Sequence, residues 1–267
     1  MNADLAFLKL GGSLITEKDR PHIARPEVLA RLAGEIAAAR ADNPSLRLLL
    51  GHGSGSFGHV PAKRWGTRAG IRSPEGWQGF VEVWREAAAL NRLALDALEN
   101  AGLPAMGFPP SAAVLAQDGA VLRWDTAPIQ AALEAGLLPV IYGDTVFDQA
   151  RGATILSTEE LFDYLVPRLK PGRVHLAGLE AGVWEDFPDR RRLIQEITPQ
   201  NAGQVEAALG GSAATDVTGG MASKVRQSLA LAAVSPGLEV HIFSGEKAGA
   251  VYRALLGTPA GTVIHAP

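Results

Sequence analysis

Short apolar runs alternate along the chain with longer segments in which apolar residues recur at helical spacing. Leu29, Leu32 and Ile36, for example, lie three and four residues apart, as on one face of a helix. The pattern predicts strands at residues 5–10, 46–50, 137–142, 174–176 and 239–243, and helices at residues 26–41, 81–101, 161–169 and 223–233. Several of the strands are followed at once by glycine.

Strand, glycine turn and helix follow one another repeatedly, which is typical of an α/β fold. Such units favour an open αβα sandwich, in which helices cover both faces of a mainly parallel sheet. Because no linker or internal repeat interrupts the pattern, we expect residues 1–267 to form a single domain. Ligands of such folds bind beyond the carboxyl ends of the strands, where the glycine turns lie.

Composition narrows the classes of partner. The chain has 267 residues with 25 Lys and Arg against 28 Asp and Glu, and a net charge of −3 gives no electrostatic basis for binding nucleic acid. No apolar run approaches the roughly 20 residues that span a bilayer, so we expect no membrane partner. The absence of cysteine excludes disulfides, thiolate metal sites and a cysteine nucleophile. We therefore expect a soluble, cytoplasmic protein.

The first glycine turn, Gly11-Gly12, directly follows the strand at residues 5–10. Glycine lets a backbone approach an anion closely because no Cβ intervenes, and successive N–H groups can bind phosphate oxygens. Lys9 lies inside the apolar strand, where a buried cation needs an anionic partner. A simple tight turn is the alternative for the glycines alone, but Lys9 favours an anion site.

A second glycine-rich segment, GHGSGSFGH at residues 51–59, follows the next strand. We expect a loop that wraps a ligand, since ordering so many glycines costs conformational entropy. It is not a Walker A loop, because no Gly-Lys-Ser/Thr follows. His59 is the better candidate for hydrogen bonding to an oxyanion, whereas His52 fits a packed position. The two histidines have no third ligand nearby, so we expect no metal site in the protein itself.

A third segment, DVTGGMASK at residues 216–224, opens the last predicted helix with Gly220 and places Lys224 one turn inside it. Helix N-termini attract anions, so this pair indicates a phosphate site, with an ordinary surface lysine as the alternative. Ser157 and Glu160 fit helix capping rather than chemistry. Glycine turns with lysines, in the absence of an acyl-transfer triad, suit phosphoryl transfer, which requires positioning and charge neutralisation.

Four motifs, in their order and spacing, resemble the amino acid kinase superfamily: LKLGGS at residues 8–13, HGSGSFGH at 52–59, STEE at 157–160 and TGGMASK at 218–224. Lys18 after GGSLIT and His59 at the end of the second motif are similar to the branch that phosphorylates isopentenyl phosphate. The resemblance implies an αβα sandwich, usually homodimeric, with the substrate bound in the N-terminal half and ATP in the C-terminal half. It also implies Mg²⁺ carried by the ATP phosphates.

The resemblance further implies roles for individual residues. The implied catalytic residues are Lys9, Lys18, Glu159 and Lys224, with Lys18 acting on the charge of the transition state and Glu159 orienting lysines. The implied contacts to the substrate phosphate are Gly53, Gly58, His59 and Thr158. The implied nucleotide contacts are Lys9, Gly11, Gly12, Ser13, Ser54, Leu179, Trp184, Gly220 and Lys224.

The chain departs from the superfamily pattern at four places. Ser54 stands where an extra glycine is usual, and Thr145 follows Gly143-Asp144 where a valine is usual. Glu159 stands where an aspartate is usual, and the adenosine-side turn at residues 179–184 lacks two usual aspartates, although Trp184 can stack on adenine.

The implied activity is ATP-dependent conversion of isopentenyl phosphate to isopentenyl diphosphate. The apolar tail of this substrate needs an apolar pocket, for which Trp77, Phe80, Val83 and Trp84 are candidates, with core packing as the alternative for most of them. Two alternatives stay open: a kinase of another phosphomonoester or of a phosphonate, similar to fosfomycin kinases, and a nucleotide- or anion-binding protein without turnover.

Overall fold

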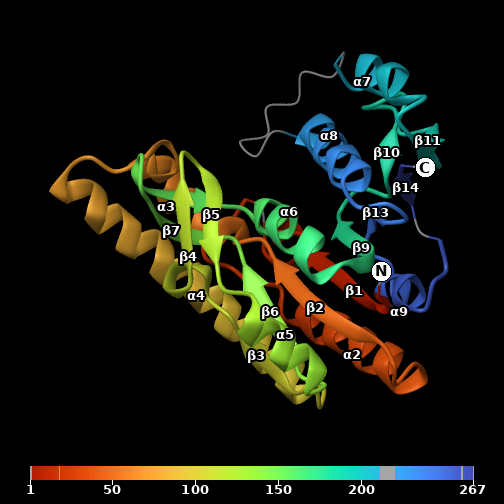
Figure 1. Cartoon of the computed structure of the whole chain (residues 1–267), viewed down its shortest axis with the longest axis horizontal. Helices are drawn as coiled ribbons and strands as arrows, with labels where there is room; N and C mark the ends of the chain where they lie inside the picture. Colours follow the sequence, from red (N-terminus) through yellow and green to blue (C-terminus); the bar gives the residue numbers. More distant parts are fainter. Residues whose placement is uncertain (1, 18, 211–219, 260, 267) are drawn as a thin grey trace.

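The computed structural model describes residues 2–17, 19–210, 220–259 and 261–266, and in them an eight-stranded sheet runs through the middle of the molecule (Figure 1). Its strands stand in the order β12-β14-β13-β9-β1-β2-β6-β3, and neighbours are parallel except for β13 and β14. The strands are β1 (Asn2–Leu10), β2 (Arg47–His52), β3 (Ala105–Gly107), β6 (Leu138–Tyr142), β9 (Pro171–Gly178), β12 (Glu196–Ile197), β13 (Glu239–Ser244) and β14 (Thr262–His265).

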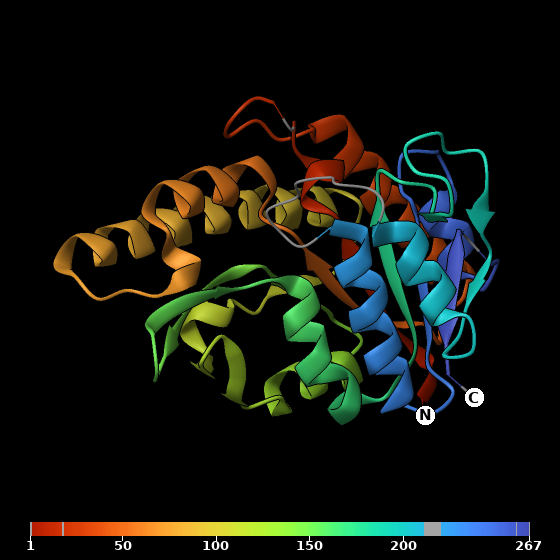
Figure 2. The same ribbon diagram turned by 90° about the horizontal axis from the view of Figure 1, so that it is seen from above.

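Helices cover both faces of this sheet (Figure 2). Successive residues of β1 point to opposite faces, so that Phe7 lies in one hydrophobic core and Leu8 in the other. The helices on the Phe7 side are α5 (Ala127–Glu134), α6 (Thr158–Leu169), α7 (Ala202–Gly210) and α8 (Gly220–Ala233). Those on the Leu8 side are α1 (Gly12–Ile15), α2 (Pro26–Asp42), α3 (Gly55–Trp65), α4 (Pro74–Asn100) and α9 (Ala250–Leu255). Among the described residues, none of the helices is both long and apolar enough to cross a membrane.

A second sheet, with the strand order β5-β4-β7-β8, extends the core on the Phe7 side. Its strands are β4 (Val114–Gln117), β5 (Ala120–Trp124), β7 (Asp144–Asp148) and β8 (Gly152–Leu156). Val114, Trp124 and Val146 bury their side chains in the same core as Phe7. Two short strands, β10 (Val183–Trp184) and β11 (Leu193–Ile194), form a separate antiparallel pair after β9.

The α/β class and the mainly parallel sheet are confirmed, and each predicted strand and helix is present with shifted ends. The loop predicted for residues 51–59 is wrong, because β2 continues to His52 and α3 begins at Gly55. Helix α4 begins at Pro74 rather than at residue 81. The Ser73 hydroxyl accepts a hydrogen bond from the Gly76 N–H (3.2 Å) and so caps that earlier start.

Candidate active site

The turns after β1 and β2 are joined to neighbouring strands by backbone hydrogen bonds at the carboxyl edge of the sheet. The Gly11 N–H donates to the Ala177 carbonyl of β9 (2.8 Å), and the Gly53 N–H donates to the Leu10 carbonyl of β1 (3.0 Å). The two glycine turns identified in the sequence therefore lie next to each other, at the edge where an α/β sheet binds its ligands.

Glycine is required where these turns touch. A Cβ on Gly12 would lie 2.4 Å from the Gly55 nitrogen, and a Cβ on Gly53 would lie 2.8 Å from the Gly12 nitrogen. Gly55 also has a φ of +49°, a left-handed conformation that side chains rarely adopt, and its Cβ would lie 2.3 Å from Thr16 Oγ1. The main role of these glycines is therefore to let two backbones pack together. Placing backbone amides near a ligand is a consequence of that packing.

Some of the predicted phosphate donors are engaged within the protein. The Gly11 N–H differs from its predicted role, because it completes the hydrogen bonding of the sheet. The buried Thr158 hydroxyl donates to the His52 carbonyl (2.6 Å). Gly12 and Ser13 open α1, and the N–H groups of a first helical turn have no acceptor within their own helix. Their place as nucleotide contacts stays a prediction.

Lys9 and Glu159 form an ion pair across 150 positions of sequence. Lys9 is the last residue but one of β1, and Glu159 lies in the first turn of α6. Only 12% and 13% of the two side chains is exposed. Burial raises the pKa of the Glu159 carboxyl, but the ammonium groups of Lys9 and Lys224 outweigh it and hold that pKa below its ordinary value. The carboxylate is therefore charged at neutral pH and directs Lys9 toward the site.

The start of α6 is held by a capping box, as the sequence predicted. The Ser157 hydroxyl accepts a hydrogen bond from the Glu160 N–H (3.2 Å), and the Glu160 carboxylate accepts one from the Ser157 N–H (2.7 Å). This double contact fixes the first turn, and with it the direction in which Glu159 leaves the helix.

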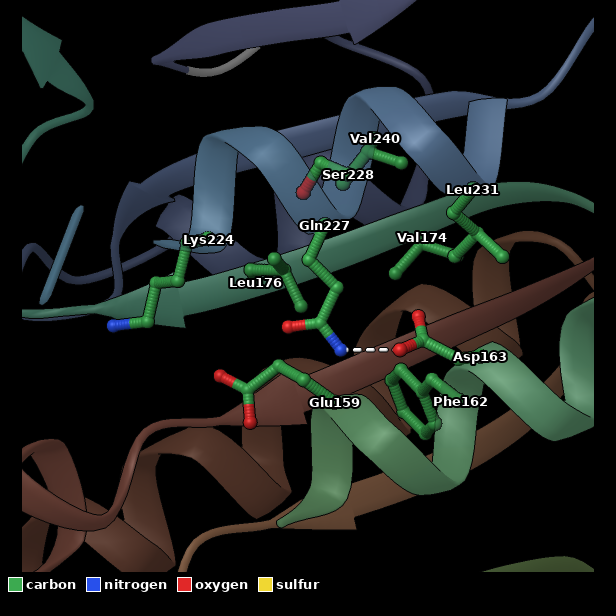
Figure 3. Close-up of a pocket in the computed structure, with 10 residues that line it drawn as sticks. All are labelled: Glu159, Phe162, Asp163, Val174, Leu176, Lys224, Gln227, Ser228, Leu231 and Val240. Carbon is green, nitrogen blue, oxygen red and sulfur yellow. Dashed lines mark hydrogen bonds between the residues drawn. The ribbon is translucent and has the colours of Figure 1, made fainter. Parts of the chain in front are cut away.

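Lys224 lies at the beginning of the second turn of α8, at the same end of the space between α6 and α8 as Glu159 (Figure 3). Gly220, the first residue of that helix, has a φ of +63°, and a Cβ there would meet nothing within 4 Å. The structure thus brings together Lys9, Glu159 and Lys224 from β1, α6 and α8. Lys18 lies outside the described residues.

The predicted substrate contacts Gly58 and His59 lie on α3 rather than in a loop. A Cβ on Gly58 would meet Ser54 Oγ at 2.4 Å, so the first turn of α3 is tightly packed, while the His59 side chain is exposed. His52 is buried against Tyr142, with ring centroids 5.5 Å apart, and this confirms its packed position. Burial lowers the pKa of His52 and keeps its ring neutral.

The turn at residues 179–184, predicted from the resemblance to face adenosine, is held by contacts of Glu180. Trp184 on β10 donates its indole N–H to Glu180 (3.0 Å), and Glu180 also pairs with Arg190 (2.8 Å). The Arg190 hydrogen bond holds the pKa of Glu180 below its ordinary value. Leu179, directly after β9, is exposed. The roles of Leu179 and Trp184 in nucleotide binding stay predictions.

Sequence reasoning gave no role to two buried acids. Asp144 follows Tyr142-Gly143 at the end of β6, accepts hydrogen bonds from the N–H groups of Ser111 (3.1 Å) and Thr145 (2.8 Å), and has its pKa raised by burial to about 6. Burial also raises the pKa of Asp163 on α6 to about 6. The signal for Asp144 was its place after a strand and a glycine. Asp163 lies four residues after Glu159, on the same helix face.

Chemically, the site offers one ammonium group paired with a carboxylate, a second ammonium group that lowers the pKa of the same carboxylate, and a pair of close-packed backbone turns. Lys9 and Lys224 supply positive charge to which phosphate oxygens can bind. Such an arrangement can neutralise charge that spreads over a transferring phosphoryl group, and it contains no Ser-His-Asp relay among these residues.

Comparison with known proteins agrees with this geometry. The model of the amino acid kinase family matches residues 4–244. The isopentenyl phosphate kinase of Methanocaldococcus jannaschii is 34% identical over 269 residues, covering 97% of this chain and 98% of that protein. The enzyme of that name from Methanothermobacter thermautotrophicus is 37% identical over 266 residues, covering 95% and 96%. A solved isopentenyl phosphate kinase structure superimposes with a TM-score of 0.81 at 32% identity, covering 97% of this chain and 99% of that one. The chain belongs to the amino acid kinase family.

Proposed function

We propose that this protein transfers the γ-phosphoryl group of ATP to isopentenyl phosphate, giving isopentenyl diphosphate and ADP. The observation that carries the proposal is the Lys9–Glu159 ion pair beside Lys224, set against the two glycine turns. Relatives named isopentenyl phosphate kinase match this chain over nearly its full length. That coverage extends to the segments that carry all three residues.

The reaction needs no general base from the protein. A phosphate oxygen of isopentenyl phosphate is already ionised at neutral pH, and it attacks the γ-phosphorus of ATP in line with the departing oxygen. The new oxygen–phosphorus bond forms as the bond between the γ-phosphorus and the β,γ-bridging oxygen breaks, and ADP leaves with that oxygen. Catalysis then depends on holding two mutually repelling phosphates together.

The lysines provide that positioning. Lys9, at the end of β1, stabilises the transferring group, and Lys224 on α8 binds the terminal phosphates of ATP. The negative charge of Glu159 keeps the two ammonium groups at the site when no phosphate is bound. Lys18, placed by sequence alone, neutralises charge in the transition state. A group acting mainly in the transition state affects kcat more than substrate affinity, so Lys18→Ala should lower kcat with little change in KM.

The N-terminal half supplies the acceptor side. His59 on α3, with Gly53 and Gly58 nearby in the chain, contacts the substrate phosphate. The isopentenyl tail requires apolar surface, and Trp77 and Phe80 on α4 form a partly exposed aromatic cluster with Phe147. Ring centroids in this cluster lie 5.2 to 5.9 Å apart. This surface suits a short hydrocarbon chain.

Magnesium enters as part of the substrate Mg-ATP. Among the described residues, no group of three or more His, Asp or Glu side chains is placed to hold a metal ion. Mg²⁺ in such sites takes most of its ligands from water and nucleotide phosphates, so a protein cage is not required.

We also propose that the protein is a homodimer and acts in the cytoplasm. Light scattering of the purified chain measures its oligomeric state.

The direct test is turnover. Purified protein with Mg-ATP and isopentenyl phosphate should yield ADP and isopentenyl diphosphate in equal amounts. Phosphorus NMR measures both products. His59→Ala should raise the KM for isopentenyl phosphate at least about tenfold, the effect of losing a charge-assisted contact, and leave ATP binding unchanged. His265→Ala, which removes a histidine on β14, is the matched control and should retain the wild-type KM.

Two other outcomes contradict the proposal. Turnover of a phosphonate such as fosfomycin, without turnover of isopentenyl phosphate, identifies a kinase of another acceptor. Tight ATP binding with no product from a panel of alkyl and prenyl monophosphates identifies a binding protein. The proximity of Lys9 and Lys224 to Glu159 favours the catalytic function over the second of these.

A further inference from the structure

Helices α6 and α8 face each other across a space that their side chains do not fill (Figure 3). The space lies over β9 and β13, and its cavity has a volume of about 20 Å³, enough for roughly one water molecule. Most of its walls are the apolar side chains of Phe162, Val174, Leu176, Leu231 and Val240. The side chains of the two helices therefore leave a gap in their packing, of about the size of one water molecule.

One hydrogen bond crosses this space. The Gln227 side-chain amide on α8 donates to the Asp163 carboxylate on α6, and the two side chains point toward each other (Figure 3). Within the described ranges it is the one direct side-chain hydrogen bond between these helices. The separation of α6 and α8 therefore depends on this contact together with the apolar packing beside it.

Helical spacing connects this contact to the catalytic cluster. Asp163 lies four residues after Glu159, and Gln227 lies three residues after Lys224, so each pair shares one face of its helix. Figure 3 shows Glu159 and Lys224 at one end of the space and the Asp163–Gln227 contact further along. A change in that contact moves α8 relative to α6, and with it the Lys224 ammonium relative to Glu159.

Asp163 is an unfavourable choice if its purpose is packing alone. Burial raises its pKa to about 6, and the carboxylates of Glu160 and Glu159 on the same helix raise it further, against the opposing hydrogen bond from Gln227. A buried acid paired with an amide rather than a cation costs stability that an apolar side chain of similar size would not. The hydrogen bond between Asp163 and α8 explains the presence of this acid, whereas packing alone does not.

We propose that the Asp163–Gln227 hydrogen bond is a latch between α6 and α8 that places Lys224 for the terminal phosphates of ATP. In this proposal both are positioning residues, since they act through Lys224. The latch rests on the proposed function only in that Lys224 binds ATP, so its test is ATP affinity, which does not depend on the identity of the acceptor.

The first variants separate the hydrogen bond from the charge. Gln227→Leu removes the donor at similar size, and it should raise the Kd for ATP about three- to tenfold, the factor that corresponds to one net hydrogen bond, as measured by calorimetry. The KM for isopentenyl phosphate should stay unchanged. Asp163→Asn keeps an acceptor oxygen and should bind ATP within about twofold of wild type. Arg226→Ala, next to Gln227 on the exposed side of α8, is the matched control and should bind ATP as the wild type does.

A double variant separates positioning from folding. Replacing both partners by leucine removes the buried polar groups, so Asp163→Leu/Gln227→Leu should unfold at or above the temperature of Gln227→Leu, yet bind ATP as weakly. Wild-type ATP affinity in Gln227→Leu, or recovery of affinity together with stability in the double variant, overturns the latch. If the wild type binds ATP but does not phosphorylate isopentenyl phosphate, the proposed function fails while the latch is still decided by the Kd values. A wild type that does not bind ATP overturns both.

Discussion

Gly12 and Gly55 touch backbone to backbone, although 42 residues separate them in the chain. A Cβ on Gly12 would lie 2.4 Å from the Gly55 nitrogen and 2.6 Å from its Cα. The contact joins the start of α1 to the start of α3, and it brings together the two segments that carry the predicted phosphate contacts. Neither backbone can retreat easily, because hydrogen bonds tie the turns to β1 and β9.

Gly12→Ala should therefore destabilise the protein and abolish most activity. The added methyl group forces the two turns apart, and overpacking of this kind costs about 1–3 kcal/mol. Thermal unfolding and kcat/KM measure the two effects. Gly34→Ala is the control: a Cβ there meets nothing within 4 Å, so alanine in the exposed interior of α2 should stabilise the helix by about 0.5–1 kcal/mol. Equal stability of the two variants would contradict the steric account.

The glycine contact also shows where sequence reasoning failed. The composition of residues 51–59 indicates a loop, yet α3 begins at Gly55 because the Ser56 N–H donates to Thr16 Oγ1 (3.1 Å) and because Gly55 adopts a positive φ. The Thr16 contact joins segments 40 residues apart, so local propensity does not contain it. Five strands of the main sheet (β1, β2, β6, β9 and β13) were predicted, since parallel strands buried on both faces form continuous apolar runs. The short strands β3, β12 and β14 were missed.

The residues of the site also divide into those that the sequence indicated and those that it did not. Lys9 was identifiable because a cation inside an apolar strand needs a partner, and motif order supplied Glu159 and Lys224. Gln227 has no motif and no periodic signal, and its importance comes from the helix that lies opposite. The sheet of β4, β5, β7 and β8 was missed because its strands, unlike the equally short β6, are not buried at every position and give no continuous apolar run.

Glu159→Gln should lower kcat at least about tenfold, because Lys9 loses the charge that directs it and a mostly buried ammonium loses its partner. Glu159→Asp keeps the charge on a shorter side chain and should retain activity within a few-fold, so charge and length are tested separately. Steady-state kinetics at saturating Mg-ATP and isopentenyl phosphate measure both variants. Wild-type kcat in Glu159→Gln would remove this carboxylate from the catalytic machinery.

Two tryptophans test the division of the chain into a nucleotide half and an acceptor half. Trp184→Leu should raise the KM for ATP about fivefold through loss of a stacking surface, and leave the KM for isopentenyl phosphate unchanged. Trp77→Leu should do the reverse, because Trp77 belongs to the aromatic cluster with Phe80 and Phe147. The two variants serve as controls for each other, and parallel changes in both KM values would contradict the assignment.

Three buried histidines should make the protein sensitive to acid. Burial lowers the pKa of His52, His175 and His241, and His175 lies well below its ordinary value, with His241 and Arg173 lowering it further. Neither ring nitrogen of His175 has a hydrogen-bond partner. The unfolded chain binds protons at these rings below about pH 6.5, whereas the folded chain binds them only at lower pH. Their contribution to stability is therefore present above that pH and is lost as the pH falls.

Asp144 and Asp163 act in the opposite direction, because their pKa values of about 6 let the folded chain bind protons before the unfolded chain does. A variant is therefore needed to isolate the histidine effect. His175→Leu should lose about 1.4 kcal/mol less stability than wild type between pH 7.5 and 5.5, the linkage expected for one histidine that is neutral only when folded. Chemical denaturation at the two pH values measures the difference. Phe243→Leu is the control, because Phe243 packs against His175 and the variant keeps His175 and His241. Its stability should depend on pH as that of the wild type does. If His175→Leu shows the same pH dependence as the wild type, the His175 ring accepts a proton in the folded protein.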